Sequence, residues 1–150
     1  KVVAQGPPVD VLSRPRAVGV ANLVGVDNLL RLPVVAHDER GGVTLLGLDD
    51  GQELAAPLTD AAPGSTAGVG FYADEVMLCL ERPSGLSARN ALRVIILRLD
   101  TVGHEVLAEL GIGSVRLRAR LTPAAASELG LAPGASLVAL IKTSAIHWLG

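Results

Sequence analysis

Short aliphatic segments alternate with polar turn clusters along most of the chain, which is the pattern of a meander of short β-strands. The turns Asp38-Glu39-Arg40-Gly41-Gly42 and Asp49-Asp50-Gly51 separate the first of these segments. Residues 115–121 alternate most clearly, because aliphatic residues and three arginines fall on opposite faces. We expect strands over residues 29–36, 43–48, 52–58, 92–99, 104–110, 115–121, 135–142 and 145–148, with a further strand after Pro63-Gly64 and another around residues 76–80.

One short helix is expected after residue 121. Thr122 is a typical N-cap, Pro123 suits the first helical position, and Gly130 is a typical C-terminal stop. Five strands with a helix between the third and fourth is the order of a small OB-like barrel. The expected fold class is therefore mainly β, with two tandem small OB-like five-stranded barrels, of which the second carries the short helix.

The two barrels are expected because residues 28–78 and 90–148 look like two copies of one module. The offset between the copies is 63 at the end of the third strand (121 − 58 = 63), but 70 at Pro63 and Pro133 (133 − 63 = 70). Seven residues therefore entered the second copy before its fourth strand. About two helical turns account for them.

The corner after the fourth strand is acidic in the first copy and basic in the second. The offset of 70 aligns Tyr72, Asp74 and Glu75 with Lys142, Ser144 and Ala145. Because carboxylates repel an anion, only the second corner suits one. Asp74 and Glu75 are either ordinary loop acids or an acidic replacement that disables an anion site in the first copy, and we favour the replacement.

Composition narrows the classes of partner. The chain has 150 residues, a formal net charge of −2 and 2% aromatic residues, which argues against a base-stacking surface for nucleic acid. We expect no membrane-spanning segment, since every apolar run is short, and no signal peptide.

Each half of about 60 residues is marginal alone, so the halves, or two chains, should pair. Lys1 in place of Met indicates a piece of a longer polypeptide.

Individual side chains outside the corners have plainer interpretations. Cys79 is expected to be a buried thiol, and His37 a surface residue. No histidine has partners at metal-ligand spacing, so no metal site is expected. The row of Arg116, Arg118 and Arg120 should be a solvated or interface face of its strand.

Three segments carry a family resemblance. The runs Ser87-Ala88-Arg89-Asn90-Ala91-Leu92, Ala119-Arg120-Leu121-Thr122 and Leu140-Ile141-Lys142-Thr143 resemble the molybdate-binding Mop-type domain, in its order and spacing. Residues 23–82 look like the related TOBE module. Residues 1–25 resemble the tail of an ABC importer ATPase domain. We therefore expect residues 1–22 to be that tail or linker, 23–82 a first TOBE-like barrel, and 83–150 a second, Mop-like oxyanion-binding barrel.

The resemblance implies the C-terminal regulatory region of the ATPase subunit of a molybdate-type ABC importer. Such a region would bind molybdate or tungstate to control transport and would need no cofactor. The sequence contains no Gly-Lys pair, so a P-loop is absent and we expect no enzyme activity from this chain. The implied partners are a second copy in a homodimer, the ATPase domain of the same polypeptide and, through it, the membrane subunits. The implied location is cytoplasmic, at the inner face of the cell membrane.

A tetrahedral dianion needs converging N–H and hydroxyl donors and positive charge. Ala88 leaves its N–H unobstructed, Arg89 offers a planar fork, and Lys142 adds a point charge. Thr122 would add a hydroxyl at a helix N-terminus. The candidate oxyanion-binding residues are Ser87, Ala88, Arg89, Thr122, Lys142 and Thr143. The resemblance implies that Ser87, Ala88 and Arg89 come from one side of a dimer, and Thr122, Lys142 and Thr143 from the other.

Two departures from the family pattern keep alternatives open. Ala125 stands where members often have a small hydroxyl residue, and Val94 where they often have glycine. The chain could instead sense sulfate or another oxyanion, because hydroxyls and cations do not encode the central atom. It could also be a structural dimerisation module with a vestigial site. A free-standing storage protein fits less well with residues 1–25.

Overall fold

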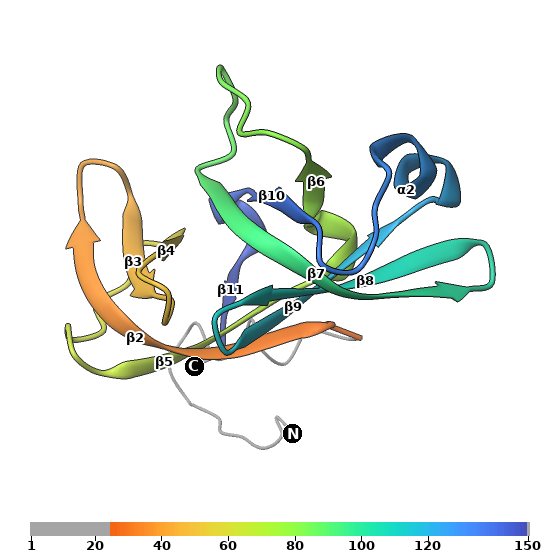
Figure 1. Ribbon diagram of the computed structural model, residues 1–150. Coiled ribbons are helices and arrows are strands. Elements are labelled where there is room, and N and C mark those ends of the chain that lie inside the picture. Colours follow the sequence, from red (N-terminus) through yellow and green to blue (C-terminus); the bar gives the residue numbers. More distant parts are fainter. Residues whose placement is uncertain (1–24, 150) are drawn as a thin grey trace.

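The computed structural model describes residues 25–149, and the tail or linker expected over residues 1–22 lies outside them. The two copies have the same order of elements (Figure 1). The first copy contains β2 (Asn28–Asp38), β3 (Val43–Gly47), β4 (Glu53–Pro57), β5 (Thr66–Phe71), the 3-10 turn η1 (Ala73–Glu75) and β6 (Met77–Cys79). The second contains β7 (Asn90–Val102), β8 (Glu105–Ile112), β9 (Val115–Leu121), α2 (Pro123–Leu129), β10 (Ser136–Ile141), the 3-10 turn η2 (Thr143–Ala145) and β11 (His147–Trp148).

The expected fold class is confirmed: the chain is mainly β, with two curved five-stranded sheets and one short helix in the second copy. Helix α2 supplies the seven extra residues. The hydroxyl of Thr122 accepts a hydrogen bond from the N–H of Ala125 at 3.1 Å, and Gly130 ends the helix at a φ of 64°. No residue of α2 is buried, so this helix lies on the surface of its barrel.

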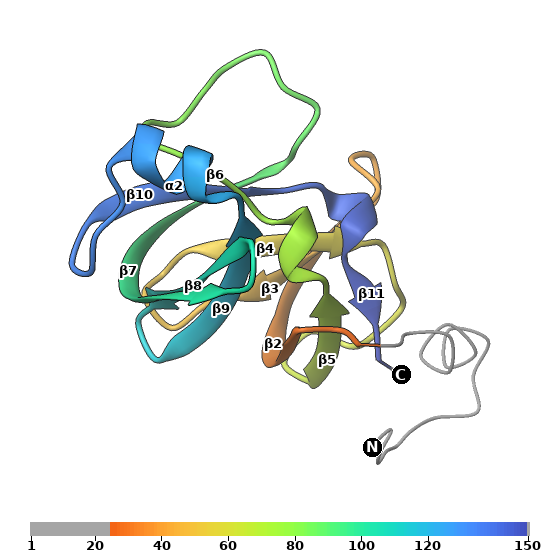
Figure 2. The same ribbon diagram turned by 90° about the vertical axis from the view of Figure 1, so that its right-hand side faces the viewer.

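The strand that ends each copy pairs with the other copy. Strand β6 adds to the second sheet beside β10, with Leu78 opposite Ala139, and β11 adds to the first sheet beside β5, with His147 opposite Gly70. The sheet orders are therefore β6-β10-β7-β8-β9 and β11-β5-β2-β3-β4 (Figure 2). We had expected each fifth strand to close its own barrel. The division into residues 23–82 and 83–150 stays a prediction, and backbone hydrogen bonds cross it in both directions.

Two buried asparagines join the copies at equivalent places. Asn90, 2% exposed, accepts a hydrogen bond from Ala55 N at 2.7 Å and donates to Ala55 O at 3.0 Å and to Ile141 O at 3.1 Å. Asn28, also 2% exposed, accepts from Arg118 N at 2.7 Å and donates to Arg118 O at 3.0 Å. The side-chain amide of each asparagine thus hydrogen-bonds both the N–H and the C=O of one residue of the other copy, as a neighbouring strand would.

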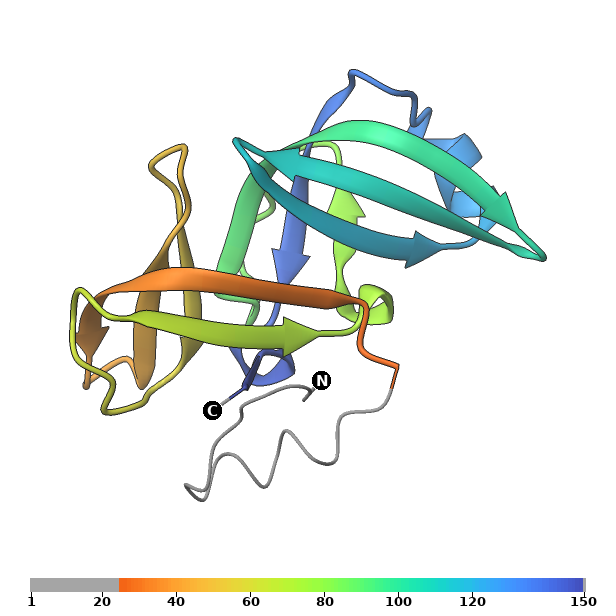
Figure 3. The same ribbon diagram turned by 90° about the horizontal axis from the view of Figure 1, so that it is seen from below.

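Further contacts between the copies surround this pair. Gln52 bonds the backbone of Arg93 in both directions, at 2.8 and 3.0 Å. Asp49 accepts hydrogen bonds from the backbone and hydroxyl of Ser114, and these bonds lower the pKa of its carboxyl. Trp148 donates from Nε1 to Pro57 O at 2.9 Å. Strands of both copies enclose one continuous apolar core (Figure 3).

The expected faces of β9 are confirmed, since Leu117 and Ala119 are buried while Arg116 and Arg118 are exposed. Cys79 is half-buried, and its thiol lies 3.7 Å from Val138 O. Burial raises the pKa of this thiol. Within residues 25–149, no helix is long and apolar enough to cross a membrane.

Replacing Asn90 with Ala should lower the free energy of unfolding by about 2–4 kcal/mol, because it leaves buried backbone groups of Ala55 and Ile141 without partners. Chemical denaturation followed by circular dichroism measures the change. The exposed Ser127→Ala variant is the control and should change stability by less than about 0.5 kcal/mol. A loss at Asn90 no larger than that of the control would contradict the bridging role.

Candidate oxyanion site

Arg89 and Lys142 flank the last paired residues of two neighbouring strands. Strands β7 and β10 are antiparallel, and Asn90 lies opposite Ile141 at the end of the ladder. The next residue on each strand is a cation, so the pairing brings Arg89 and Lys142 to the same corner. Both side chains are exposed, and neither forms an ion pair with a described residue. We call this place, with Thr143, the second corner.

The segment before Arg89 folds back onto its guanidinium. Nη2 of Arg89 donates to Leu86 O at 2.6 Å, and Nε donates to Ser87 O at 3.2 Å. Ser87 is exposed and Ala88 is half-exposed. Because a guanidinium has five N–H groups, three stay available to an anion. The structure therefore brings Ser87, Ala88 and Arg89 together at the start of β7, as a compact unit.

Thr143 opens the turn η2 immediately after Lys142, and η2 lies against β4 of the first copy. The hydroxyls of Thr143 and of Thr59, two residues past the end of β4, are both buried without a hydrogen-bond partner. They are the two such side-chain atoms in the described part of the chain. Buried hydroxyls are normally satisfied in native proteins, so the unpartnered hydroxyl of Thr143 at the second corner indicates a place for an acceptor.

Thr122 lies in a different environment. Its hydroxyl caps α2, and the residue two positions before it, Arg120, binds Asp27 and Asp74 of the first copy. Turn η1 lies against β9 just as η2 lies against β4. Of the six predicted residues, the structure brings together five in one chain and places Thr122 beside the equivalent corner of the first copy. Thr59 is the residue that corresponds to Thr122 by the repeat (122 − 59 = 63).

That first corner is filled by the protein's own charges. Asp27 accepts a hydrogen bond from Ala73 N at 2.8 Å. It also forms an ion pair with Nη2 of Arg120 at 3.2 Å. Arg120 also pairs with Asp74 at 2.9 Å and with Glu105 at 3.3 Å. The hydrogen bond to Asp74 raises the pKa of the Arg120 guanidinium. The predicted row of arginines, a solvated or interface face, divides in this way: Arg116 and Arg118 are exposed, whereas Arg120 is half-buried at the contact with the first copy.

The two corners can be superposed by sequence position. Asp27 corresponds to Arg89 (89 − 27 = 62), and Ala73 corresponds to Thr143 (143 − 73 = 70). In the first corner, the N-terminal end of the 3-10 turn holds a carboxylate through the N–H of Ala73. In the second corner, a cation replaces that carboxylate. The N–H at the start of the 3-10 turn thus suits an anionic oxygen. Among the described residues, the first corner supplies that oxygen from Asp27, whereas the second corner has no carboxylate at the equivalent position.

The sequence reasoning overlooked Asp27, Arg120 and Thr59. The signal for Asp27 was present, because the offset of 62 that aligns Asn28 with Asn90 also aligns Asp27 with Arg89. The offset of 63 likewise aligns Thr59 with Thr122, but nothing in the spacing places Arg120 beside Asp27, since that contact crosses the boundary between the copies. The described residues contain no group of three or more histidines, cysteines and carboxylates that could hold a metal ion.

Comparison with known proteins gives a family and a fold. The model of the TOBE domain matches residues 86–148. The chain is 40% identical over 116 residues to the molybdenum import ATP-binding protein ModC of Yersinia pseudotuberculosis, covering 77% of this chain and 32% of that protein. It is 35% identical over 147 residues to ModC of Albidiferax ferrireducens, covering 97% and 39%. The chain thus spans about a third of the length of these curated relatives.

A solved structure has the same fold. The cytoplasmic molybdate-binding protein ModG, in a crystal form with molybdate bound, superposes with a TM-score of 0.70 at 30% identity. The alignment covers 83% of this chain and 96% of that one. Nearly the whole of ModG is therefore matched by residues of both copies.

Asp27→Ala should lower the free energy of unfolding by about 1–3 kcal/mol, because it removes the acceptor of Ala73 N and the less exposed partner of Arg120. The control is Asp74→Ala, whose side chain is 67% exposed and whose loss should cost less than about 1 kcal/mol. Urea denaturation of both variants measures the difference. Equal losses would show that the first corner does not depend on the carboxylate of Asp27.

Proposed function

We propose that this chain, which belongs to the TOBE domain family, is the oxyanion-sensing regulatory region of a molybdate importer ATPase. The anion bound at the second corner would be molybdate or tungstate, held without covalent chemistry. The observation that carries the proposal is the pair of equivalent corners, of which the first holds a carboxylate and the second offers a cation at the same place. The similarity to a molybdenum import ATP-binding protein and to a molybdate-binding protein supports molybdate as the anion.

The roles of the residues follow from their chemistry. Arg89 would grip two oxygens with its planar guanidinium, and Lys142 would add a second positive charge to balance a dianion. Thr143 would donate its unpartnered hydroxyl, and Ser87 and Ala88 a hydroxyl and a backbone N–H. Because such donors are held by strand pairing before the anion arrives, little ordering opposes binding.

Thr122 would enter the site from a second copy of the chain, since in its own chain its hydroxyl caps α2 and Arg120, two residues before it, pairs with Asp27 and Asp74 of the first corner. This is the proposed reason for a homodimer. The anion would then bridge the two chains and favour one arrangement of the ATPase domains to which they are attached. By linkage, an anion that binds one arrangement more tightly shifts the population towards it.

The remainder of the polypeptide is proposed from the relatives, which are about three times as long. It would carry the ATP-hydrolysing domain, contact the membrane subunits and place this region at the inner face of the cell membrane. The described residues would contribute regulation and no catalytic step. In this arrangement, binding at the second corner reports intracellular oxyanion to the transporter.

The alternative of a vestigial site loses part of its support. Val94 is 2% exposed, lies in the core of β7 and pairs with Leu137 of β10, so its side chain is a packing residue. Its difference from the family pattern therefore removes no donor from the corner. Ala125 does lack a hydroxyl, which leaves sulfate or another oxyanion as the second candidate ligand.

Replacing Arg89 with Ala should weaken molybdate binding tenfold or more, equivalent to about 1.5–3 kcal/mol for lost charge-assisted hydrogen bonds. Isothermal titration with molybdate, tungstate and sulfate measures the affinity. The matched control is Arg93→Ala, an exposed arginine four positions along the same strand, which should bind as the unaltered chain does. Absence of heat with all three anions would reject the sensor in favour of a structural module.

Asp74→Ala should leave the affinity for molybdate nearly unchanged, because Asp74 belongs to the first corner and pairs there with Arg120. The same titration also gives the stoichiometry, expected to be one anion per chain. A second anion, or a large change of affinity, would show that the first corner also takes part.

A further inference from the structure

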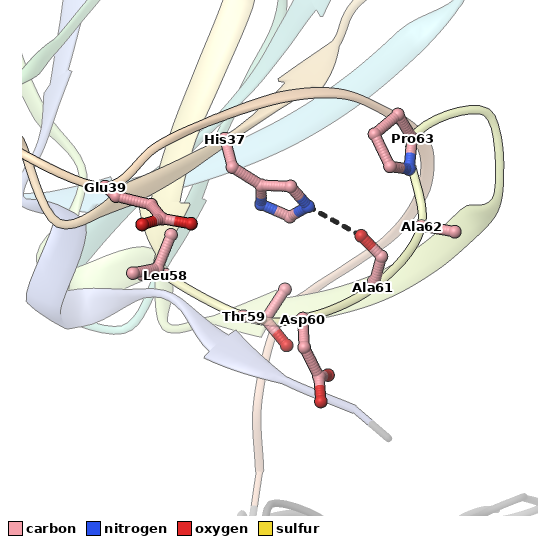
Figure 4. Close-up of a pocket in the computed structure, with 8 residues that line it drawn as sticks. All are labelled: His37, Glu39, Leu58, Thr59, Asp60, Ala61, Ala62 and Pro63. Atoms are coloured by element: carbon pink, nitrogen blue, oxygen red, sulfur yellow. Dashed lines mark hydrogen bonds between the residues drawn. The ribbon is translucent and has the colours of Figure 1, made fainter.

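The loop between β4 and β5 encloses a hollow of about 560 Å³ beside His37 (Figure 4). Residues 58–63 form one wall, and His37 and Glu39 of the β2–β3 hairpin form the other. The expectation that His37 is a simple surface residue is wrong. It is half-buried, and both of its ring nitrogens have hydrogen-bond partners.

The partners of His37 determine which tautomer its neutral imidazole adopts. Nε2 lies 2.6 Å from Ala61 O, which can only accept, so Nε2 carries the proton. Nδ1 then accepts from the hydroxyl of Thr44 at 2.8 Å. The oxygen of this hydroxyl accepts in turn from Thr59 N at 3.0 Å. One imidazole therefore holds the loop at two points, directly through Ala61 and through Thr44 at Thr59.

We call the hydrogen bonds that link His37 to Ala61 and, through Thr44, to Thr59 the relay. No equivalent relay occurs among the described residues of the second copy. The strand pairing that sets His37 opposite Thr44 sets Leu99 opposite Ala108 in the second copy. There the connection between the third and fourth strands contains α2, whereas residues 58–63 are a short loop. The polar pair thus occurs in the copy whose loop lacks a helix to give it shape. The relay is a substitute for that helix.

The residue that this relay fixes is one of the two with an orphan hydroxyl. Thr59 is held by its N–H, while its buried hydroxyl has no partner. It lies two residues beyond β4, against which η2 packs, and Pro57 of β4 accepts the indole N–H of Trp148 just after η2. Strand β4, from which this loop starts, therefore contacts both η2 and Trp148, which follows η2.

We propose that His37 is a positioning residue of the oxyanion site. Through Thr44 and Ala61 it holds the loop so that the hydroxyl of Thr59 faces the second corner, where it donates to the bound anion beside Thr143. This inference rests on the proposed function and adds to it a hydroxyl from the first copy of the same chain. It also makes anion binding sensitive to the protonation of one imidazole.

Protonation of His37 would reverse the hydrogen bond between its Nδ1 and the hydroxyl of Thr44. A second N–H on Nδ1 would face the oxygen of Thr44, which already accepts from Thr59 N, and the Thr44 proton would lose its acceptor. The charged groups that face this side of the hollow are Glu39 and Asp60, both exposed.

The test is titration of the full chain with sodium molybdate, for the unaltered protein and for His37→Ala, Thr44→Val and Thr59→Val. Loss of the Thr59 hydroxyl should weaken binding about tenfold, and loss of its positioning about threefold to fivefold, as expected for one hydrogen bond to a charged ligand. His104→Ala, at an exposed turn, is the matched control and should bind normally. Thermal unfolding of each variant separates misfolding from loss of binding.

Two further readouts distinguish positioning from general stability. Amide exchange of Thr59 should accelerate in His37→Ala and Thr44→Val, because its N–H loses its fixed acceptor. The affinity of the unaltered chain should fall when His37 is protonated at acidic pH, and that fall should be absent in His37→Ala, while Arg89→Ala keeps its pH dependence.

The outcomes separate the two proposals. If Arg89→Ala weakens binding but folded His37→Ala and Thr44→Val bind as the unaltered chain does, the positioning role is overturned and the oxyanion site stands. The positioning role is also overturned if folded Thr59→Val binds molybdate as the unaltered chain does. If the unaltered chain binds no molybdate, both proposals fall together. Weakened binding with an unchanged melting temperature, accelerated exchange at Thr59 and a lost pH dependence would establish the relay.

Discussion

The exchange of terminal strands between the copies, fastened by two buried asparagines, is the constraint on which the rest of the structure depends. Strand β6 completes the second sheet and β11 completes the first, so neither copy of about 60 residues has to bury its core alone. Asn28 and Asn90 satisfy backbone groups of the opposite copy that would otherwise be buried without partners. As a result, each corner is built from both copies. Turn η2 lies against β4, and η1 lies against β9.

The nearly symmetric frame carries opposite charges at its two corners. In the first, Asp27 and Asp74 surround Arg120, and the corner is electrostatically complete. In the second, Arg89 and Lys142 have no carboxylate partner among the described residues, and the hydroxyl of Thr143 has no acceptor. The two corners therefore differ in charge at equivalent positions, with Asp27 in the first and Arg89 in the second. The ion pairs of Arg120 with Asp27 and Asp74 join the two copies at the first corner.

The same division extends to the connections between the third and fourth strands. The second copy uses helix α2, whose first turn is fixed by the hydroxyl of Thr122. The first copy uses a short loop fixed by His37 and Thr44, and the hydroxyl of Thr59 stays unengaged. The equivalent threonines therefore differ: the hydroxyl of Thr122 caps a helix, and the hydroxyl of Thr59 has no hydrogen-bond partner. Because the difference arises from seven inserted residues, a change in loop length has altered the polar chemistry available at each corner.

The sequence by itself determined the strands, the helix and its caps, the repeat, and the cationic character of Arg89 and Lys142. Those features depend on local periodicity and on residues close in the chain, which a single sequence records directly. The tertiary structure decided which copy completes which sheet, and it placed β4 against η2 and β9 against η1. It also turned Arg120 from a surface residue into the centre of an ion cluster. These facts depend on pairings between strands some 60 to 90 residues apart, and no local pattern distinguishes a strand that closes its own barrel from one that closes its neighbour's.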